Sequence, residues 1–118
     1  MSYTSYAALN SLEETSFIAQ SEFTLYFTAY QADGVTPLDL GGAYISWELC
    51  PYGQDSYTVL QKIAVVTGAN TFKVVLLAND TRGLSGKYIH QPVITSFAGN
   101  IYRPAQGVLL ILPAIPVT

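Results

Sequence analysis

The feature that most constrains the fold of this chain is a strict alternation of side-chain character between residues 22 and 30. Every second side chain there is apolar: Phe23, Leu25, Phe27 and Ala29. Threonines and tyrosines fill the positions between them: Thr24, Tyr26, Thr28 and Tyr30. A period of two places one set on the buried face of a β-strand and the other set outside. The same period recurs along the chain and helical periodicity is hard to find, so we expect an all-β fold.

Two short motifs predict a more specific architecture. A double-glycine turn leads into a strand that contains Trp47, and a Gly-x-Tyr step leads into a second strand at Tyr88. In an immunoglobulin-like sandwich, a buried tryptophan packs on the core and a tyrosine closes a corner. His90 lies two residues after Tyr88, where such a domain carries a core cysteine, so we expect a neutral, hydrogen-bonded imidazole that points inward. We therefore predict an immunoglobulin-like antiparallel β-sandwich of about seven strands.

The length of 118 residues indicates one domain. We expect the sandwich itself to span residues 21–112, between an extended N-terminal arm at 1–20 and a C-terminal tail at 113–118. Both ends carry apolar or aromatic side chains where disordered ends usually carry charges. Two interpretations stay open: the ends are frayed, or they are arms that settle on a neighbouring subunit.

Composition narrows the classes of partner. Half of the residues are hydrophobic and 11% are charged, so some apolar surface must lie outside one small core, as at protein contacts. A net charge of −3 provides no basic footprint, so we expect no nucleic-acid partner. The longest apolar run, residues 108–112, is far too short to cross a membrane. No signal peptide is evident and the single cysteine forms no intrachain disulfide, so we expect synthesis in the cytoplasm.

Residues suited to chemistry are few, and we expect no enzyme. His90 is the only histidine, so neither a metal site nor a base for Cys50 is indicated. Most of the carboxylates fall in predicted turns, and the sequence identifies no two of them as a catalytic acid and base. We therefore predict no catalytic residue, no metal site and no cofactor.

Aromatic and apolar residues on outward faces are the candidates for contact. Tyrosine suits protein contacts because its ring is large and rigid and its hydroxyl tolerates water. The strand expected at residues 71–77 is apolar on both faces, as in a strand that meets a partner subunit. With the two ends included, the predicted interface residues are Tyr3, Tyr6, Phe17, Tyr26, Tyr30, Tyr44, Val75, Leu77, Ile115 and Val117. The same outward tyrosines, Tyr26, Tyr30 and Tyr44, could instead stack on sugars.

Several short segments together resemble a known family. They are residues 23–30, the run from Pro37 to Leu49, residues 79–81 with Leu84, Gly86 and Tyr88, and Gly99 with residues 107–109. In order and spacing this set resembles the small amino-terminal domain of phage baseplate upper proteins, over roughly residues 20 to 112. The resemblance implies a non-enzymatic virion component that binds other phage proteins.

The resemblance also bears on which role the protein has in the virion. In this sequence no long fibre segment follows the domain, which favours a stand-alone capsid cement or decoration protein. The alternatives are a baseplate or tail adaptor for a receptor-binding protein, and a carbohydrate-binding adhesion module. The expected partners are major capsid or tail and baseplate proteins, together with copies of the chain itself, a trimer being favoured. The expected location is the virion, after synthesis in the cytoplasm of the host bacterium.

Overall fold

The computed structural model describes residues 2–6, 10–11, 15–31, 35–53, 57–103 and 105–115, with the backbone alone for 2–6, 10–11 and 105. The strands are β1 (Ser2–Tyr6), β2 (Asn10–Ser11), β3 (Thr15–Ile18), β4 (Phe23–Tyr30), β5 (Tyr44–Pro51), β6 (Leu60–Ile63), β7 (Val65–Val66), β8 (Thr71–Leu76), β9 (Gly86–Thr95), β10 (Ile101–Tyr102) and β11 (Ala105–Leu112). One short 3-10 helix, η1 (Ala78–Thr81), follows β8.

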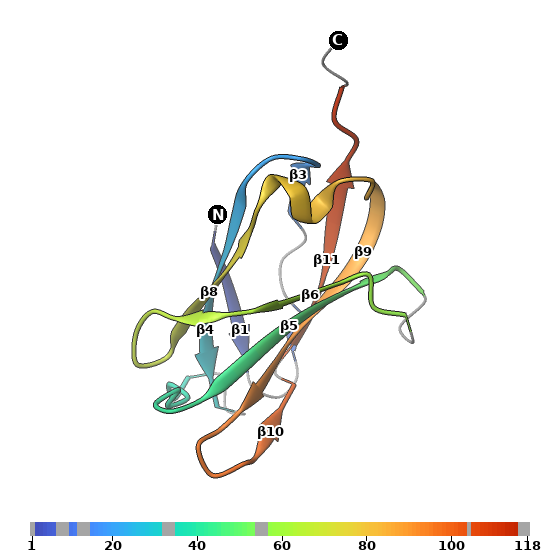
Figure 1. Ribbon diagram of the computed structural model, residues 1–118. Coiled ribbons are helices and arrows are strands. Elements are labelled where there is room, and N and C mark those ends of the chain that lie inside the picture. The colour runs from blue at the N-terminus through green and yellow to red at the C-terminus, as the bar shows by residue number, and fades with distance from the viewer. Residues whose placement is uncertain are drawn as a thin grey trace.

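The strands form two sheets that pack face to face as a sandwich (Figure 1). One sheet has the order β1-β4-β8-β7, and the other has the order β2-β11-β9-β5-β6. In the second sheet β3 also pairs with β11, and β10 pairs with β9. The predicted all-β sandwich is confirmed.

The arrangement of strands differs from the prediction in two ways. More strands form than the expected seven or so, although several of them contain only two residues. The sandwich is also not wholly antiparallel, because β1 runs parallel to β4, and β2 and β3 run parallel to β11. The immunoglobulin-like description therefore stays a prediction.

The predicted strand faces are confirmed by the register of β4 and β8. Leu25 lies opposite Val74, and Phe27 lies opposite Phe72, with all four side chains buried. The Phe27 and Phe72 rings stack with centroids 4.7 Å apart. Because successive side chains in a strand point to opposite faces, the residues between them face outward. The alternation read from the sequence thus fixes which face of this sheet meets the core.

Trp47 and His90 lie at the centre of the core, on neighbouring strands of the second sheet. Both residues are fully buried, and the indole N–H of Trp47 donates a hydrogen bond to Nδ1 of His90 at 3.0 Å. The His90 ring also lies 6.2 Å from the ring of Phe27, which belongs to the other sheet. The imidazole therefore spans the two sheets at the position where the prediction expected an inward, hydrogen-bonded histidine.

Tyr88 closes the corner before β9, as its position predicts. Its hydroxyl donates to the carbonyl of Ser85 at 3.1 Å, and the backbone N–H of Ser85 lies 3.2 Å from the same hydroxyl oxygen. The ring is buried beside the core. This bond fixes the direction in which the chain enters β9, and so supports the placement of His90 two residues later.

The described N-terminal residues pair with strands of both sheets. β1 pairs with β4 over its full length, and β3 pairs with β11 from Thr15 to Ile18. Phe17 on β3 is only 7% exposed and stacks on Phe23, with ring centroids 4.5 Å apart. The described part of residues 1–20 is therefore paired with strands of the sandwich.

Candidate interaction surfaces

His90 is held as a structural residue by its surroundings. Burial lowers the pKa of His90 to about 4, so the imidazole is neutral at pH 7. Since Nδ1 accepts the Trp47 hydrogen bond, the ring proton of the neutral form lies on Nε2. Among the described residues, no three histidine, cysteine, aspartate or glutamate side chains come together in a group able to hold a metal ion. The arrangement at His90 stabilises the core.

Three of the predicted interface residues share the outer face of the β1-β4-β8-β7 sheet. Tyr26 is exposed, and Tyr30 and Val75 are half-buried. Tyr26 lies opposite Lys73 on β8, one row from Val75. Leu77 follows β8 and is also exposed. This face combines tyrosine rings, apolar side chains and one lysine.

Tyr44 lies elsewhere, on the outer face of the other sheet. It begins β5 and pairs with Thr95 on β9, whereas Tyr26 and Tyr30 belong to β4. Three tyrosines on two different sheets do not form one flat stacking platform. Tyr26 and Tyr30 share one face, and Tyr44 belongs to another.

The remaining predicted interface residues lie near the chain ends. Phe17 is in the core and is not available for contact, which corrects its prediction as an interface residue. Tyr3 and Tyr6 lie on β1 and pair in register with Phe27 and Tyr30. Ile115 is exposed beyond the end of β11, and Val117 lies outside the described residues.

The outer face of the second sheet has a polar middle. Gln61, Glu48 and Gln91 lie side by side on β6, β5 and β9. Gln106 on β11 continues the row, since its side-chain N–H donates to the side-chain oxygen of Gln91 at 2.8 Å. This row separates two more apolar ends of the same face.

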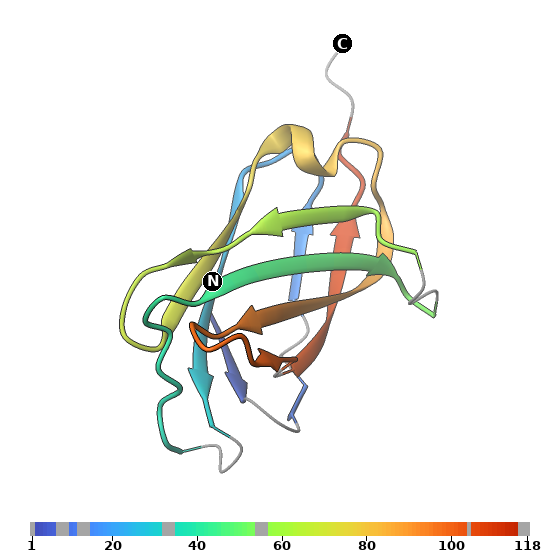
Figure 2. The same cartoon turned by 60° about the horizontal axis from the view of Figure 1, so that its bottom comes forward.

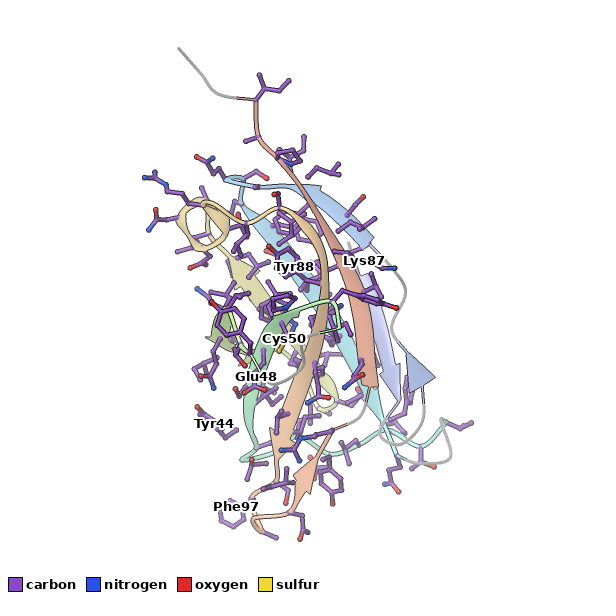
Figure 3. The ribbon with its side chains drawn as sticks, turned by 90° about the vertical axis from the view of Figure 1, so that its right-hand side faces the viewer. Tyr44, Glu48, Cys50, Lys87, Tyr88 and Phe97 are labelled. Atoms are coloured by element: carbon purple, nitrogen blue, oxygen red, sulfur yellow. The ribbon has the colours of Figure 1, made fainter. Side chains whose placement is uncertain are left out.

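At one end of that face, β9 lies between β5 and β11. Cys50 pairs with Ile89, which pairs in turn with Val108, and all three side chains are half-buried. Nearby, the ammonium group of Lys87 lies 4.2 Å from the centroid of the Tyr52 ring. Cys50, Lys87 and Tyr88 can be followed in Figure 3. A cation over an aromatic ring fixes both side chains at this end of the face.

The opposite end carries the most exposed aromatic ring among the described residues. Tyr44 pairs with Thr95, and Thr95 pairs with Ile101 on β10, so the three side chains form one row. Phe97 follows in the turn between β9 and β10 and is 87% exposed. Tyr44 and Phe97 lie at the same end of the molecule in Figure 3. We refer to Tyr44, Phe97 and Ile101, all exposed, as the Phe97 cluster.

The local backbone holds Phe97 in its exposed place. The N–H of Ser96 donates to the carbonyl of Asn100 at 2.8 Å, and the N–H of Gly99 donates to the carbonyl of Ser96 at 2.9 Å. Gly42 lies beneath the ring, so close that a Cβ atom there would be 2.9 Å from Cδ2 of Phe97. The turn therefore presents the ring to solvent in a defined position.

The sequence reading missed the Phe97 cluster except for Tyr44. A phenylalanine inside a Ser-Phe-Ala-Gly-Asn turn was the available signal, because large apolar rings are unusual at turn tips, where glycine, asparagine and serine prevail. Most of the predicted contact residues lie on strands, whereas the most exposed aromatic ring of the described residues, Phe97, lies in the turn between β9 and β10.

The edge formed by β6 and β7 is a third surface. β6 pairs only with β5 in one sheet, and β7 pairs only with β8 in the other, among the strands that the structure describes. Figure 2 shows β6 running beside β5 before the chain continues toward β8. One continuous segment is therefore the last strand of both sheets on this side of the sandwich.

No helix in the described residues is both long and apolar enough to span a membrane.

Comparisons with known proteins identify the fold. No protein family model matches the sequence, and no curated protein is close enough to count as a match. Eighteen chains of solved structures do match. One of them is the N-terminal domain of ORF48 of phage TP901-1, with a TM-score of 0.70 and 11% sequence identity, covering 94% of this chain and 96% of that chain. The chain therefore shares the fold of this phage protein domain over almost its whole length.

Proposed function

We propose that this protein is a non-enzymatic structural component of a phage virion that binds neighbouring virion proteins. The observation that carries the contact role is the Phe97 cluster, in which a ring held by its turn is 87% exposed at the same end of the face as the exposed Tyr44 and Ile101. Exposed aromatic anchors of this kind supply much of the binding energy at protein interfaces. The charged fraction of 11% leaves large parts of the surface free of competing charge.

The phage role is supported by two separate likenesses. The sequence motifs resemble the amino-terminal domain of phage baseplate upper proteins, and the fold is similar to the N-terminal domain of ORF48 of phage TP901-1. Both likenesses favour a protein that docks by its surface.

The position within the particle is a finer part of the proposal. A baseplate position follows the resemblance of the sequence to baseplate upper proteins, and a capsid cement role follows the expectation of a stand-alone domain. The two positions differ in stoichiometry, because a capsid carries many more equivalent sites than a baseplate. Quantitative mass spectrometry of purified particles distinguishes them by the number of copies per particle.

The contact role is tested with variants of the full chain in particles assembled without the wild-type protein. Phe97→Ser should lower the number of copies per particle at least roughly tenfold, the effect of losing one interface anchor. Tyr57→Ser is the matched control, because Tyr57 is exposed but lies outside the cluster, and it should leave the copy number unchanged. Tyr26→Ser reports whether the outer face of the β1-β4-β8-β7 sheet also binds a neighbour.

Two outcomes contradict the proposal. Absence of the protein from purified particles overturns the virion role. Normal incorporation of folded Phe97→Ser protein overturns the contact role of the Phe97 cluster.

A further inference from the structure

The backbone of β6 faces outward at two residues. The N–H of Ala64 donates to the carbonyl of Ile45 at 2.9 Å, and Ala64 continues the register in which Lys62 lies opposite Trp47. In an antiparallel pair, the backbone groups of alternate residues face the partner strand and those between them face away. The N–H and C=O groups of Gln61 and Ile63 therefore face away from β5, toward the side where no described strand lies.

The protection of this edge is limited to the shortness of β6 and to one lysine. Natural edge strands are kept short or carry charges, prolines or bulges that prevent pairing with another chain. The segment from Gln61 to Val66 contains no proline and one charge, Lys62. The Lys62 ammonium lies 2.8 Å from a carboxylate oxygen of Asp80 on η1, which neutralises it. Ile63 and Val65, both β-branched, are 54% and 53% exposed.

The outward backbone groups of β6 can pair with the same groups of a second copy. If two copies approach with their β6 strands antiparallel around a twofold axis, Gln61 of each copy lies opposite Ile63 of the other. All the outward backbone groups of both residues then find partners, which gives four hydrogen bonds of the antiparallel ladder type. The two Lys62 residues lie opposite each other at the axis, where like charges would repel. The ion pair with Asp80 offsets part of that repulsion within each copy.

We propose that a second copy of this chain adds to the β6 edge, joining two sandwiches through one continuous sheet. The contact is short, so the dimer is weak in dilute solution and strengthens where copies are held close together. The joined sheet also presents two Phe97 clusters on the same outer face. This inference rests on the β6 edge and does not depend on the proposed function.

The test uses the purified full chain and light scattering after size-exclusion chromatography over a wide range of concentrations. The mass should rise with concentration from 12.8 kDa toward twice that value. Ile63→Pro removes the outward N–H, a change that an edge strand tolerates when that N–H faces solvent. It should weaken dimerisation at least roughly tenfold. The matched control Ile63→Thr keeps the N–H and a β-branched side chain, and should still dimerise.

Amide hydrogen exchange gives a second measurement if Ile63→Pro fails to fold. In the wild-type chain, protection of the Gln61 and Ile63 amides should increase with protein concentration, while the Lys62 amide, which faces β5, should not change. A wild-type protein that stays monomeric at every concentration overturns the proposal. So does a dimer that folded Ile63→Pro leaves intact, or one that Ile63→Thr abolishes equally.

Discussion

His90 and Phe97 lie seven positions apart, on β9 and in the turn that follows it, and their environments are the reverse of their polarities. The polar imidazole is 0% exposed, and the apolar phenyl ring is 87% exposed. His90 is tolerated in the core because Trp47 supplies a hydrogen-bond donor and Phe27 supplies a ring contact. The comparison teaches that a residue's place follows from its available partners: His90 has two in the core, whereas the Phe97 ring is left largely to solvent by the described residues.

The largest effect is expected from removing the partner of the buried ring. Trp47→Ala should lower the free energy of unfolding by roughly 3–5 kcal/mol, because a large core side chain is lost and a cavity is left. Urea denaturation at pH 7, followed by circular dichroism, measures this change.

Trp47→Phe separates the two contributions of the indole. It keeps most of the apolar ring and loses the N–H, so its cost should be smaller, about 1–3 kcal/mol. A loss below about 1 kcal/mol for Trp47→Ala would contradict the central place given to the Trp47 and His90 pair.

The second effect is a loss of stability in acid. Burial lowers the pKa of His90 from 6.5 to about 4, so the folded state binds a proton less tightly than the unfolded state. Stability from this group is therefore complete above pH 6.5 and falls as the pH drops toward 4. The difference corresponds to about 3 kcal/mol at pH 4.

The control for this prediction is His90→Gln, which offers an acceptor to Trp47 and does not titrate. Carboxylates titrate in both proteins, so the difference between their two pH profiles isolates His90. Urea denaturation at several pH values between 7 and 4 gives the profiles. Parallel profiles would show that the imidazole gains a proton without cost, and the contrast between His90 and Phe97 would then fail.

The sequence predicts the buried residue of this comparison, His90, better than the exposed one, Phe97. The side chains around Leu25 and Phe27 alternate with a period of two, which predicts their buried face. Tyr88 and His90 are two residues apart, so the same period places both of them inward. These are local patterns, and the core that they predict is confirmed.

Other features depend on contacts that local patterns do not encode. β1 and β3 pair in parallel with strands far along the chain, and such pairings have no turn signal to reveal them. The chain passes from β6 in one sheet to β7 in the other at Ala64, and no glycine or proline between Leu60 and Val66 marks the passage. Phe97 was missed because its exposure depends on a turn geometry and on Gly42, which lies far away in the sequence.

A third, smaller effect is expected at Gly42. Its φ of +69° is in the left-handed region, and an added Cβ would lie 2.9 Å from Cδ2 of Phe97. Gly42→Ala should therefore cost about 1–2 kcal/mol for the backbone conformation, with a further cost from displacing the ring. Thermal unfolding of Gly42→Ala, Phe97→Ala and the double variant forms a cycle, in which the double variant should lose less than the sum of the single ones. Strict additivity would show that the ring does not rest on Gly42.

The smallest effect on stability is expected from the exposed ring itself. Phe97→Ala should change the free energy of unfolding by no more than about 0.5 kcal/mol, because a side chain that is 87% exposed buries little apolar surface in the isolated chain. Urea denaturation measures this beside Trp47→Ala under the same conditions. If Phe97→Ala cost more than about 1 kcal/mol, the ring would be part of the core of the fold. Unfolding would then explain why a variant without this ring fails to enter particles. A neutral effect on stability, together with failure to enter particles, assigns the ring to contact with a partner.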